Sequence, residues 1–407
     1  MQAGFHHWLL SFGDPMRILW VGTKPPWPPV DGGRLVAWLT LQALREAGHH
    51  VVLVVPSNGP PSAEALEQFR SVSHPHVVTA PPLSRTRAWL SSLISGSPST
   101  AARHAQPAVR QRVDEVIDWD PPDVVHAEQP HALAACAPAL VRGVPVVLRA
   151  HNVETDLWTA AGREPGLRGA IARREAGRVA RWEADAVSRA AATVALTEED
   201  ALRLRTLGGP DARVHRVAVP FPAEWPAAEN ALAGDPAVVV AGSGGWLPNE
   251  RGAAWFVRDA WPAVAARVPG ARLHLFGGDG PVPARAERHP VPADSRDLFA
   301  PGSIHVVPLL FGSGVRIRIL EAWARGVPVV ATGAAAAGLD ARNGVELLVE
   351  DTPQGLSNAI HRLADDRALA QGLVAAARAR LAAHHDPGRV VRALLEVYEE
   401  AVGSSGG

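Results

Sequence analysis

Short apolar runs rich in β-branched residues alternate along the chain with longer stretches of helical periodicity. This alternation is typical of βαβ units and predicts parallel sheets covered by helices. In the first half, the runs expected to be strands are Arg17–Val21, Val51–Val55, Val77–Thr79, Val124–His126 and Val144–Leu148. A Gly/Pro-rich loop follows the first run, and a helix is expected from about residue 34 to residue 47. These elements predict one α/β domain over residues 16–222, preceded by a loose extension over residues 1–15.

A second series of the same kind follows. Its expected strands are Ala237–Ala241, Arg272–Phe276, Ile304–Pro308 and Val327–Ala331. Between the two series, prolines at 220, 222 and 226 interrupt both periodicities and indicate a hinge. We therefore expect a linker over residues 223–236, a second α/β domain over residues 237–402, and a disordered tail over residues 403–407. The amphipathic stretch 387–402 could complete the second domain or cross back to the first.

Length and charge narrow the function classes. The 407 residues exceed what one hydrophobic core usually supports, which favours two domains. The formal net charge is −1, so no long-range field draws the protein onto nucleic acid, and any bound anion must be met by a local site. The single cysteine, Cys136, excludes a disulfide framework, and no apolar run approaches the roughly 20 residues that span a bilayer. A cytoplasmic location with no nucleic-acid partner is expected.

The segment 311–332 carries the strongest chemical signal, because it is expected to form a glycine loop, a helix and the next strand. Gly312 and Gly314 allow a backbone to approach a ligand, and a helix starting near Val315 would direct its free amides and positive dipole end into the same space. Arg316 and Arg318 in the first turn oppose the helix dipole unless an anion lies in front of them. The pattern indicates a phosphate site, although solvated arginines on a helix face would look the same.

At these residues the chain resembles family 4 glycosyltransferases, which have the GT-B fold of two Rossmann-like domains facing across a cleft. Most members transfer sugars from nucleotide-sugar donors with retention of configuration. The resemblance implies that Glu321 binds the donor ribose and that amides of the loop Ser313, Gly314 and Val315 hold the diphosphate. Many members carry a glutamate eight positions before Glu321, where this chain has Ser313, as do some relatives with a Gly-Ser-Gly-Val loop.

The resemblance extends to three further places. The loop after the first strand of the second domain contains Gly244, expected near the donor, but lacks the usual Arg and Lys, for which Arg316 or Arg318 would stand in. Gly32 and Gly33 match a glycine pair that approaches the donor phosphate or the acceptor. His151, at the end of a strand, matches a histidine beside the donor sugar and is our candidate catalytic residue. His126 and Glu128 also end a strand, and a place in the acceptor pocket and structural hydrogen bonding are equally open for them.

The function expected from this resemblance is transfer of a hexosyl group from a nucleoside diphosphate sugar to a hydroxyl acceptor, which could be a glycan, a lipid-linked molecule or a small molecule. A sugar-nucleotide epimerase or hydrolase on the same fold stays open, as does a non-catalytic nucleotide-sugar-binding protein. A dinucleotide cofactor is not expected, because the first glycine loop is long and proline-rich. No metal is expected, because no histidine cluster has ligand spacing. Basic and apolar residues in 84–94 and 163–189 form either solvated helices or a peripheral membrane contact at the inner face.

Overall fold

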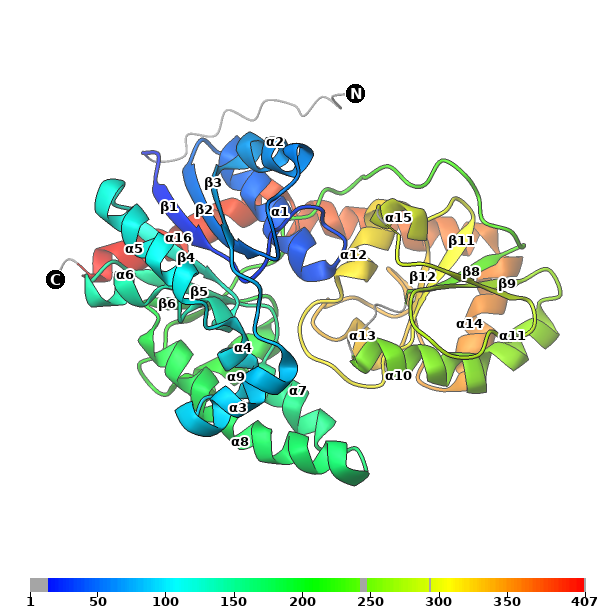
Figure 1. Ribbon diagram of the computed structural model, residues 1–407. Coiled ribbons are helices and arrows are strands. Elements are labelled where there is room, and N and C mark those ends of the chain that lie inside the picture. Colours follow the sequence, from blue (N-terminus) through cyan, green and yellow to red (C-terminus); the bar gives the residue numbers. More distant parts are fainter. Residues whose placement is uncertain (1–13, 242–246, 293, 406–407) are drawn as a thin grey trace.

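The computed structural model describes residues 14–241, 247–292 and 294–405 and has two α/β lobes (Figure 1). The first contains a seven-stranded parallel sheet in the order β3-β2-β1-β4-β5-β6-β7. Its strands are β1 (Arg17–Val21), β2 (His50–Ser57), β3 (His74–Thr79), β4 (Val124–Glu128), β5 (Val146–Ala150), β6 (Ala192–Ala195) and β7 (Val214–Arg216). The central strands are buried on both faces, as expected for a parallel sheet between helix layers.

Helices connect these strands and cover both faces of the sheet. They are α1 (Gly32–Glu46), α2 (Ala63–Val72), α3 (Arg85–Ser95), α4 (Ser99–His104), α5 (Pro107–Trp119), α6 (Ala137–Val141), α7 (Glu154–Ala161), α8 (Gly166–Arg189) and α9 (Glu198–Gly208), with a 3₁₀ turn η1 (Pro130–Ala132). Thr197 caps α9 by accepting a hydrogen bond from the amide of Asp200 at 2.9 Å.

The second lobe contains a six-stranded parallel sheet in the order β10-β9-β8-β11-β12-β13. The strands are β8 (Ala237–Ala241), β9 (Arg272–Phe276), β10 (Ala286–His289), β11 (Ser303–Val307), β12 (Val329–Ala331) and β13 (Leu348–Val349). The other elements are α10 (Leu247–Trp255), a π-helical turn η2 (Phe256–Ala260), α11 (Trp261–Arg267), η3 (Ser295–Leu298), α12 (Ile317–Ala324), α13 (Gly333–Ala336), α14 (Pro353–Asp365) and α15 (Arg367–His384). Residues 222–236, which join the lobes, contain no helix or strand.

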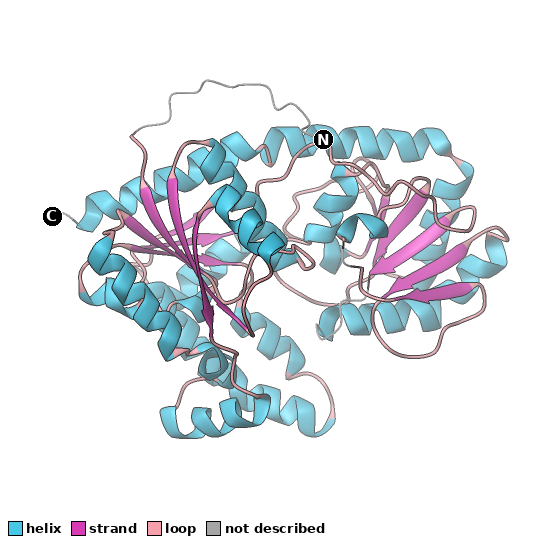
Figure 2. Cartoon of the chain, turned by 45° about the horizontal axis from the view of Figure 1, so that its top comes forward, coloured by secondary structure: helices cyan, strands magenta, loops and turns pink. Residues whose placement is uncertain are grey.

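The last helix, α16 (Pro387–Ser405), crosses back to the first lobe. Its buried residues Val391, Leu394 and Tyr398 belong to the same apolar cluster as Ile18 of β1. Residues 387–402 therefore pack with the first sheet, which is one of the two placements left open for them, and the bounds expected for the second domain were too long. The helix also continues through residues 403–405, which we expected in a disordered tail. Figure 2 shows the C-terminal helix lying along the first lobe, where the end of the chain is marked C.

The chain passes between the lobes twice, and the two passages are hydrogen-bonded to each other. The amide of Phe221 donates to the carbonyl of His385 at 2.7 Å, and the His385 imidazole lies 2.9 Å from the carbonyl of Val219. Burial lowers the pKa of His385 to about 4. The proline-rich segment predicted as a hinge thus forms one half of a two-stranded connection.

Candidate active site

In each sheet, the order of the strands reverses at a point that faces the other lobe. The reversal lies between β1 and β4 in the first sheet and between β8 and β11 in the second. In open α/β sheets, ligands bind beyond the carboxyl ends of the strands at such points. The loop after β1 leads to Gly32–Gly33 at the start of α1, and the loops after β4 and β11 carry Gln129 and Gly312–Gly314, respectively. Gly244, expected near the donor, lies outside the described residues.

The glycine loop of the second lobe lies directly against the turn after β5. Gly314 has a φ of +80°, and a Cβ there would overlap the carbonyl oxygen of His151 and lie 2.8 Å from Asn152 Oδ1. The hydroxyl oxygen of Ser313 accepts a hydrogen bond from the amide of Val153 at 3.2 Å. The predicted donor loop therefore meets, across the lobes, the turn that carries the candidate catalytic histidine.

Helix α12 begins at Ile317, two residues later than the sequence predicted, so Val315 and Arg316 precede its first turn. Arg316 is buried and its Nη2 donates to the carbonyl of Gly314 at 2.9 Å. Burial lowers the pKa of Arg316 to about 10, against the opposing effect of the Asp200 carboxylate of the first lobe. The side chain that we expected to face a phosphate is folded back onto the glycine loop.

Glu321 is fully buried and is held by three side chains. Its Oε1 accepts from the Ser295 hydroxyl and from Nε and Nη2 of Arg325, at 3.2 and 3.1 Å for the arginine. Its Oε2 accepts from Nη1 of Arg318 at 3.0 Å. Arg318 also donates to the carbonyl of Val30 in the first lobe at 3.2 Å. Arg318 is 23% exposed, and its two hydrogen bonds place it between the buried carboxylate and the first lobe.

The glycine pair of the first lobe allows α1 to begin at the centre of this site. Asp31 caps the helix by accepting from the amide of Arg34 at 2.9 Å and also binds Lys24 Nζ at 2.7 Å. A Cβ on Gly32 would lie 3.3 Å from Ile317 Cβ of α12. A Cβ on Gly33 would lie 3.5 Å from His151 Nδ1. The pair therefore permits close approach both to the other lobe and to the histidine.

His126, Glu128 and His151 form one buried network. His126 Nε2 lies 2.8 Å from Glu128 Oε2, and His151 Nε2 lies 2.6 Å from Glu128 Oε1. Arg149 contacts the same carboxylate at 2.9 Å through Nε and through Nη2. Although burial opposes ionisation, Arg149 and His151 hold the pKa of Glu128 well below its usual range. Burial lowers the pKa of His126 to about 4. Of the two roles left open, structural hydrogen bonding fits His126, whereas Glu128 directly contacts the candidate catalytic residue.

Several residues of this site were not found from the sequence. Arg325 lies one helical turn after Glu321, a spacing that would have indicated the pair. Ser295 begins η3 and Asp200 lies in the first turn of α9, and no pattern joins them to Glu321 or Arg316. Glu154, which directly follows the His151 turn, is a buried carboxyl group whose pKa is raised to about 6 by burial, against the effects of Asn152 and His151.

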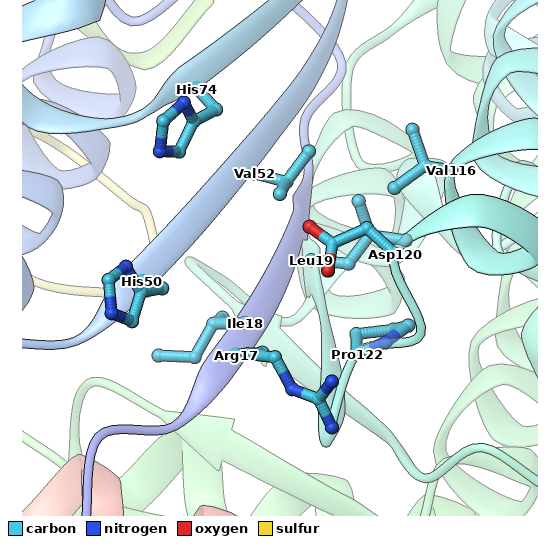
Figure 3. Close-up of a pocket in the computed structure, with 9 residues that line it drawn as sticks. All are labelled: Arg17, Ile18, Leu19, His50, Val52, His74, Val116, Asp120 and Pro122. Atoms are coloured by element: carbon cyan, nitrogen blue, oxygen red, sulfur yellow. The ribbon is translucent and has the colours of Figure 1, made fainter.

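Two other features lie away from this site. A depression of about 190 Å³ is lined by residues such as Arg17, His50 and Asp120 at the amino ends of the first sheet, opposite the glycine loops (Figure 3). Among the described residues, His274, Glu287 and His289 are close enough to share a metal ion. However, both ring nitrogens of His274 already have partners. Its Nε2 lies 2.8 Å from the carbonyl oxygen of Ala233, and its Nδ1 lies 2.9 Å from Nε2 of His289. The expectation of no metal stays a prediction.

The fold and the site together define a GT-B glycosyltransferase. Two family profiles match the sequence: "Glycosyl transferase 4-like domain" over residues 31–220 and "Glycosyl transferases group 1" over residues 235–366. The chain therefore belongs to the GT4-like, GT-B glycosyltransferases that act with nucleotide sugars. Among the described residues, no helix is long and apolar enough to cross a membrane.

Solved structures support the same fold at low sequence identity. A sucrose-phosphate synthase from Thermosynechococcus elongatus is 14% identical, with a TM-score of 0.70 and coverage of 96% of this chain and 100% of that chain. HepE of Anabaena, solved with UDP and glucose, is 16% identical, with a TM-score of 0.65 and coverage of 94% and 98%. A glycosyltransferase from Rickettsia africae is 11% identical, with a TM-score of 0.62 and coverage of 96% and 99%. No curated protein matches the sequence.

Proposed function

We propose that this protein transfers a hexosyl group from a nucleoside diphosphate sugar to a hydroxyl acceptor, with retention at the anomeric carbon. The observation that carries the proposal is the meeting of Gly33, His151 and Gly314 between the lobes, with Glu321 of α12 buried behind Arg318. A bound donor would thereby have its diphosphate near the glycine loops and its sugar near His151. No metal or other cofactor is part of the proposal.

Glu321 would bind the donor ribose and Arg318 would move to admit it. Arg318 is the partly exposed partner of the carboxylate, and its other hydrogen bond, to Val30, is a single contact with a backbone carbonyl. Once displaced from Glu321, its guanidinium would lie beside the diphosphate, where it can offset negative charge. The amino end of α12, where the helix dipole is positive, would add electrostatic stabilisation of the departing diphosphate.

Ser313 has a different role from the glutamate that many relatives carry at this position. Its hydroxyl oxygen accepts from Val153, so it holds the glycine loop against the His151 turn. Contacts of that glutamate with the donor sugar are therefore not transferred to this chain. The alignment of acceptor and donor would depend on the closed arrangement of the lobes, which also excludes water and limits hydrolysis.

A donor screen by thermal shift tests the proposal. UDP-glucose is the first probe, because HepE of Anabaena was solved with UDP-glucose, and GDP- and dTDP-sugars complete the panel. We expect one donor class to raise the melting temperature, and Glu321→Ala to abolish the rise. Glu346→Ala is the matched control, because Glu346 is likewise buried in the second lobe and contacts Arg342, outside the site. An unchanged rise in Glu321→Ala would place the donor elsewhere.

Turnover separates the proposed activity from its alternatives. With the donor identified, a panel of hydroxyl acceptors should increase nucleoside diphosphate release well above the rate with donor alone. Donor consumption that no acceptor accelerates would instead indicate an epimerase or hydrolase. Thermal stabilisation without any turnover would indicate a binding protein. The anomeric configuration of the product, read by NMR coupling constants, tests retention.

We also propose a peripheral contact with an anionic lipid surface through α3. Trp89, Leu90 and Ile94 of this helix are 51%, 55% and 91% exposed, and Arg85 and Arg87 lie in its first turn. Exposed large apolar side chains beside cations match the chemistry of an anionic membrane surface. The helix lies at the lower end of the first lobe in Figure 1. Such a contact would suit a lipid-linked acceptor.

A further inference from the structure

The two ring nitrogens of His151 have different surroundings. Nε2 lies 2.6 Å from Glu128 Oε1, inside the first lobe. Nδ1 lies on the side of Gly33, where a Cβ would be 3.5 Å away, and is 3.4 Å from Gln129 Nε2. One nitrogen therefore faces the protein interior and the other faces the glycine pair that lines the candidate site.

The Glu128 carboxylate decides which nitrogen carries the proton. A carboxylate offers about four lone-pair sites. Four donors converge on Glu128: Arg149 through Nε and Nη2, His126 through Nε2 and His151 through Nε2. Arg149 keeps Glu128 ionised, and an ionised carboxylate can only accept hydrogen bonds. His151 Nε2 must then donate its N–H to Glu128, which leaves the lone pair of the neutral ring on Nδ1.

The other side of Glu128 is fixed by the last helix. His126 is fully buried, stacks on Trp20 with ring centroids 3.8 Å apart, and lies 2.7 Å from the Tyr398 hydroxyl through Nδ1. Because His126 Nε2 donates to Glu128, its Nδ1 accepts a hydrogen bond from the Tyr398 hydroxyl. The hydrogen bonds therefore run in one direction, from Tyr398 of α16 to His126 and from His126 to Glu128.

We propose that Glu128 is a positioning residue that holds His151 as the Nε2–H tautomer, with Nδ1 presented as the acceptor for a substrate hydroxyl, and that Tyr398 anchors Glu128 through His126. The crossing of α16 back to the first lobe thus supports the catalytic side chain as well as the fold. The part of this proposal that concerns substrate rests on the proposed transferase function. The tautomer assignment does not.

Nitrogen NMR of the protein labelled with ¹⁵N-histidine tests the tautomers directly. Long-range ¹H–¹⁵N correlation distinguishes a protonated from a bare ring nitrogen, and His151→Gln and His126→Gln assign the two signals by their loss. At neutral pH we expect both rings to carry the proton on Nε2. A proton on Nδ1 of His151 would overturn the proposal, even if the enzyme proves active.

Variants test whether Glu128 is responsible. In Glu128→Gln we expect His151 to become a mixture of tautomers and kcat to fall by roughly tenfold to a hundredfold, the range seen when a group orienting a histidine ligand is removed, with KM for the donor nearly unchanged. Thr40→Val is the matched control, because Thr40 accepts from Nη1 of Arg149 at 2.8 Å without contacting Glu128. We expect it to keep both the tautomer and kcat. A folded Glu128→Gln protein with an unaltered His151 tautomer and unaltered kcat would contradict the assigned role.

Tyr398→Phe provides a second test if Glu128→Gln does not fold. Loss of the hydroxyl should shift the Nδ1 signal of His126 and lower kcat by less than the change at Glu128. An unshifted His126 signal would contradict the proposed series of hydrogen bonds from Tyr398 through His126 to Glu128. A wild-type protein with the expected tautomers but no turnover would overturn the transferase function and leave the tautomer assignment standing.

Discussion

Arg325 reaches back one helical turn and places Nη2 3.1 Å from Oε1 of Glu321. The guanidinium is itself covered by the linker, since it stacks over Trp225 with its central carbon 4.2 Å from the ring centroid and donates to the carbonyl of Pro226. Glu321 and Arg325 are 0% and 4% exposed. The segment between the domains therefore holds the proposed ribose-binding carboxylate in place.

Arg325→Leu should be strongly destabilising, because it leaves a buried carboxylate without its main partner. Removing one partner of a buried ion pair costs about 3–5 kcal/mol. Arg296→Leu is the control: its pair with Asp294 is exposed, and such pairs contribute at most about 1 kcal/mol. Urea unfolding followed by circular dichroism measures both. Equal losses in the two variants would show that Glu321 does not depend on Arg325.

Gly314→Ala should separate the lobes and weaken donor binding. Its Cβ would overlap the carbonyl oxygen of His151, in addition to the strain of a φ of +80°. Gly344→Ala is the matched control, because its φ is +77° and a Cβ there meets nothing within 4 Å. Both variants should lose stability from backbone strain, but only Gly314→Ala should also lose the donor-induced rise in melting temperature and show a larger radius in small-angle scattering. Retention of the donor effect would contradict the contact.

The two-domain fold was predictable because both halves repeat the alternation of buried strands and amphipathic helices. The place of α16 was not, since an apolar face such as that of Val391, Leu394 and Tyr398 fits either sheet equally well. Only the position of the chain after α15, at the paired passages near His385, brings it to the first lobe.

The candidate site was predictable only where its residues lie in one continuous segment. The sequence of the loop and helix from Gly312 to Glu321 is enough to indicate an anion site. The burial of Arg316 was not predictable in this way, because Asp200, the carboxylate that favours its charged form, lies more than a hundred residues earlier in the chain. The partner of His126 on α16 was hidden for the same reason, because Tyr398 and His126 are 272 positions apart.

The membrane proposal predicts that the intact protein binds vesicles containing an anionic phospholipid more strongly than neutral vesicles. Arg87→Glu combined with Trp89→Ala should reduce this binding by removing a cation and an exposed aromatic side chain from α3. Arg110→Glu combined with Trp119→Ala, on α5, is the matched control. Vesicle co-sedimentation measures all three. The absence of binding by the unmodified protein would end the proposal.

Glu183 of α8 supports the turn that carries His151 and should make stability depend on pH. Its carboxylate accepts from the amides of Glu154 and Thr155 at 2.8 and 2.9 Å and from the Thr155 hydroxyl at 2.6 Å, which satisfies the start of α7. Burial raises its pKa to about 7 from 4.5, against the lowering effect of the Thr155 hydrogen bonds. Helix α7 begins three residues after His151, so this contact bears on the site.

The direction in which Glu183 makes stability change with pH follows from proton linkage. Because the folded state holds the Glu183 proton more tightly than the unfolded state, this group's contribution to stability is complete below about pH 4.5 and is lost as the pH rises through about 7. Glu183→Gln is uncharged throughout, so the melting temperature of the wild type should fall relative to that of the variant between pH 5 and pH 8, by about 2–4 °C for each kcal/mol. The buried His126 and His131, whose pKa values burial lowers to about 4, destabilise the fold in acid, but they do so in both proteins and cancel in the difference. Parallel curves of melting temperature against pH would mean that Glu183 is ionised in the folded protein over the whole range and that α7 begins on a full negative charge.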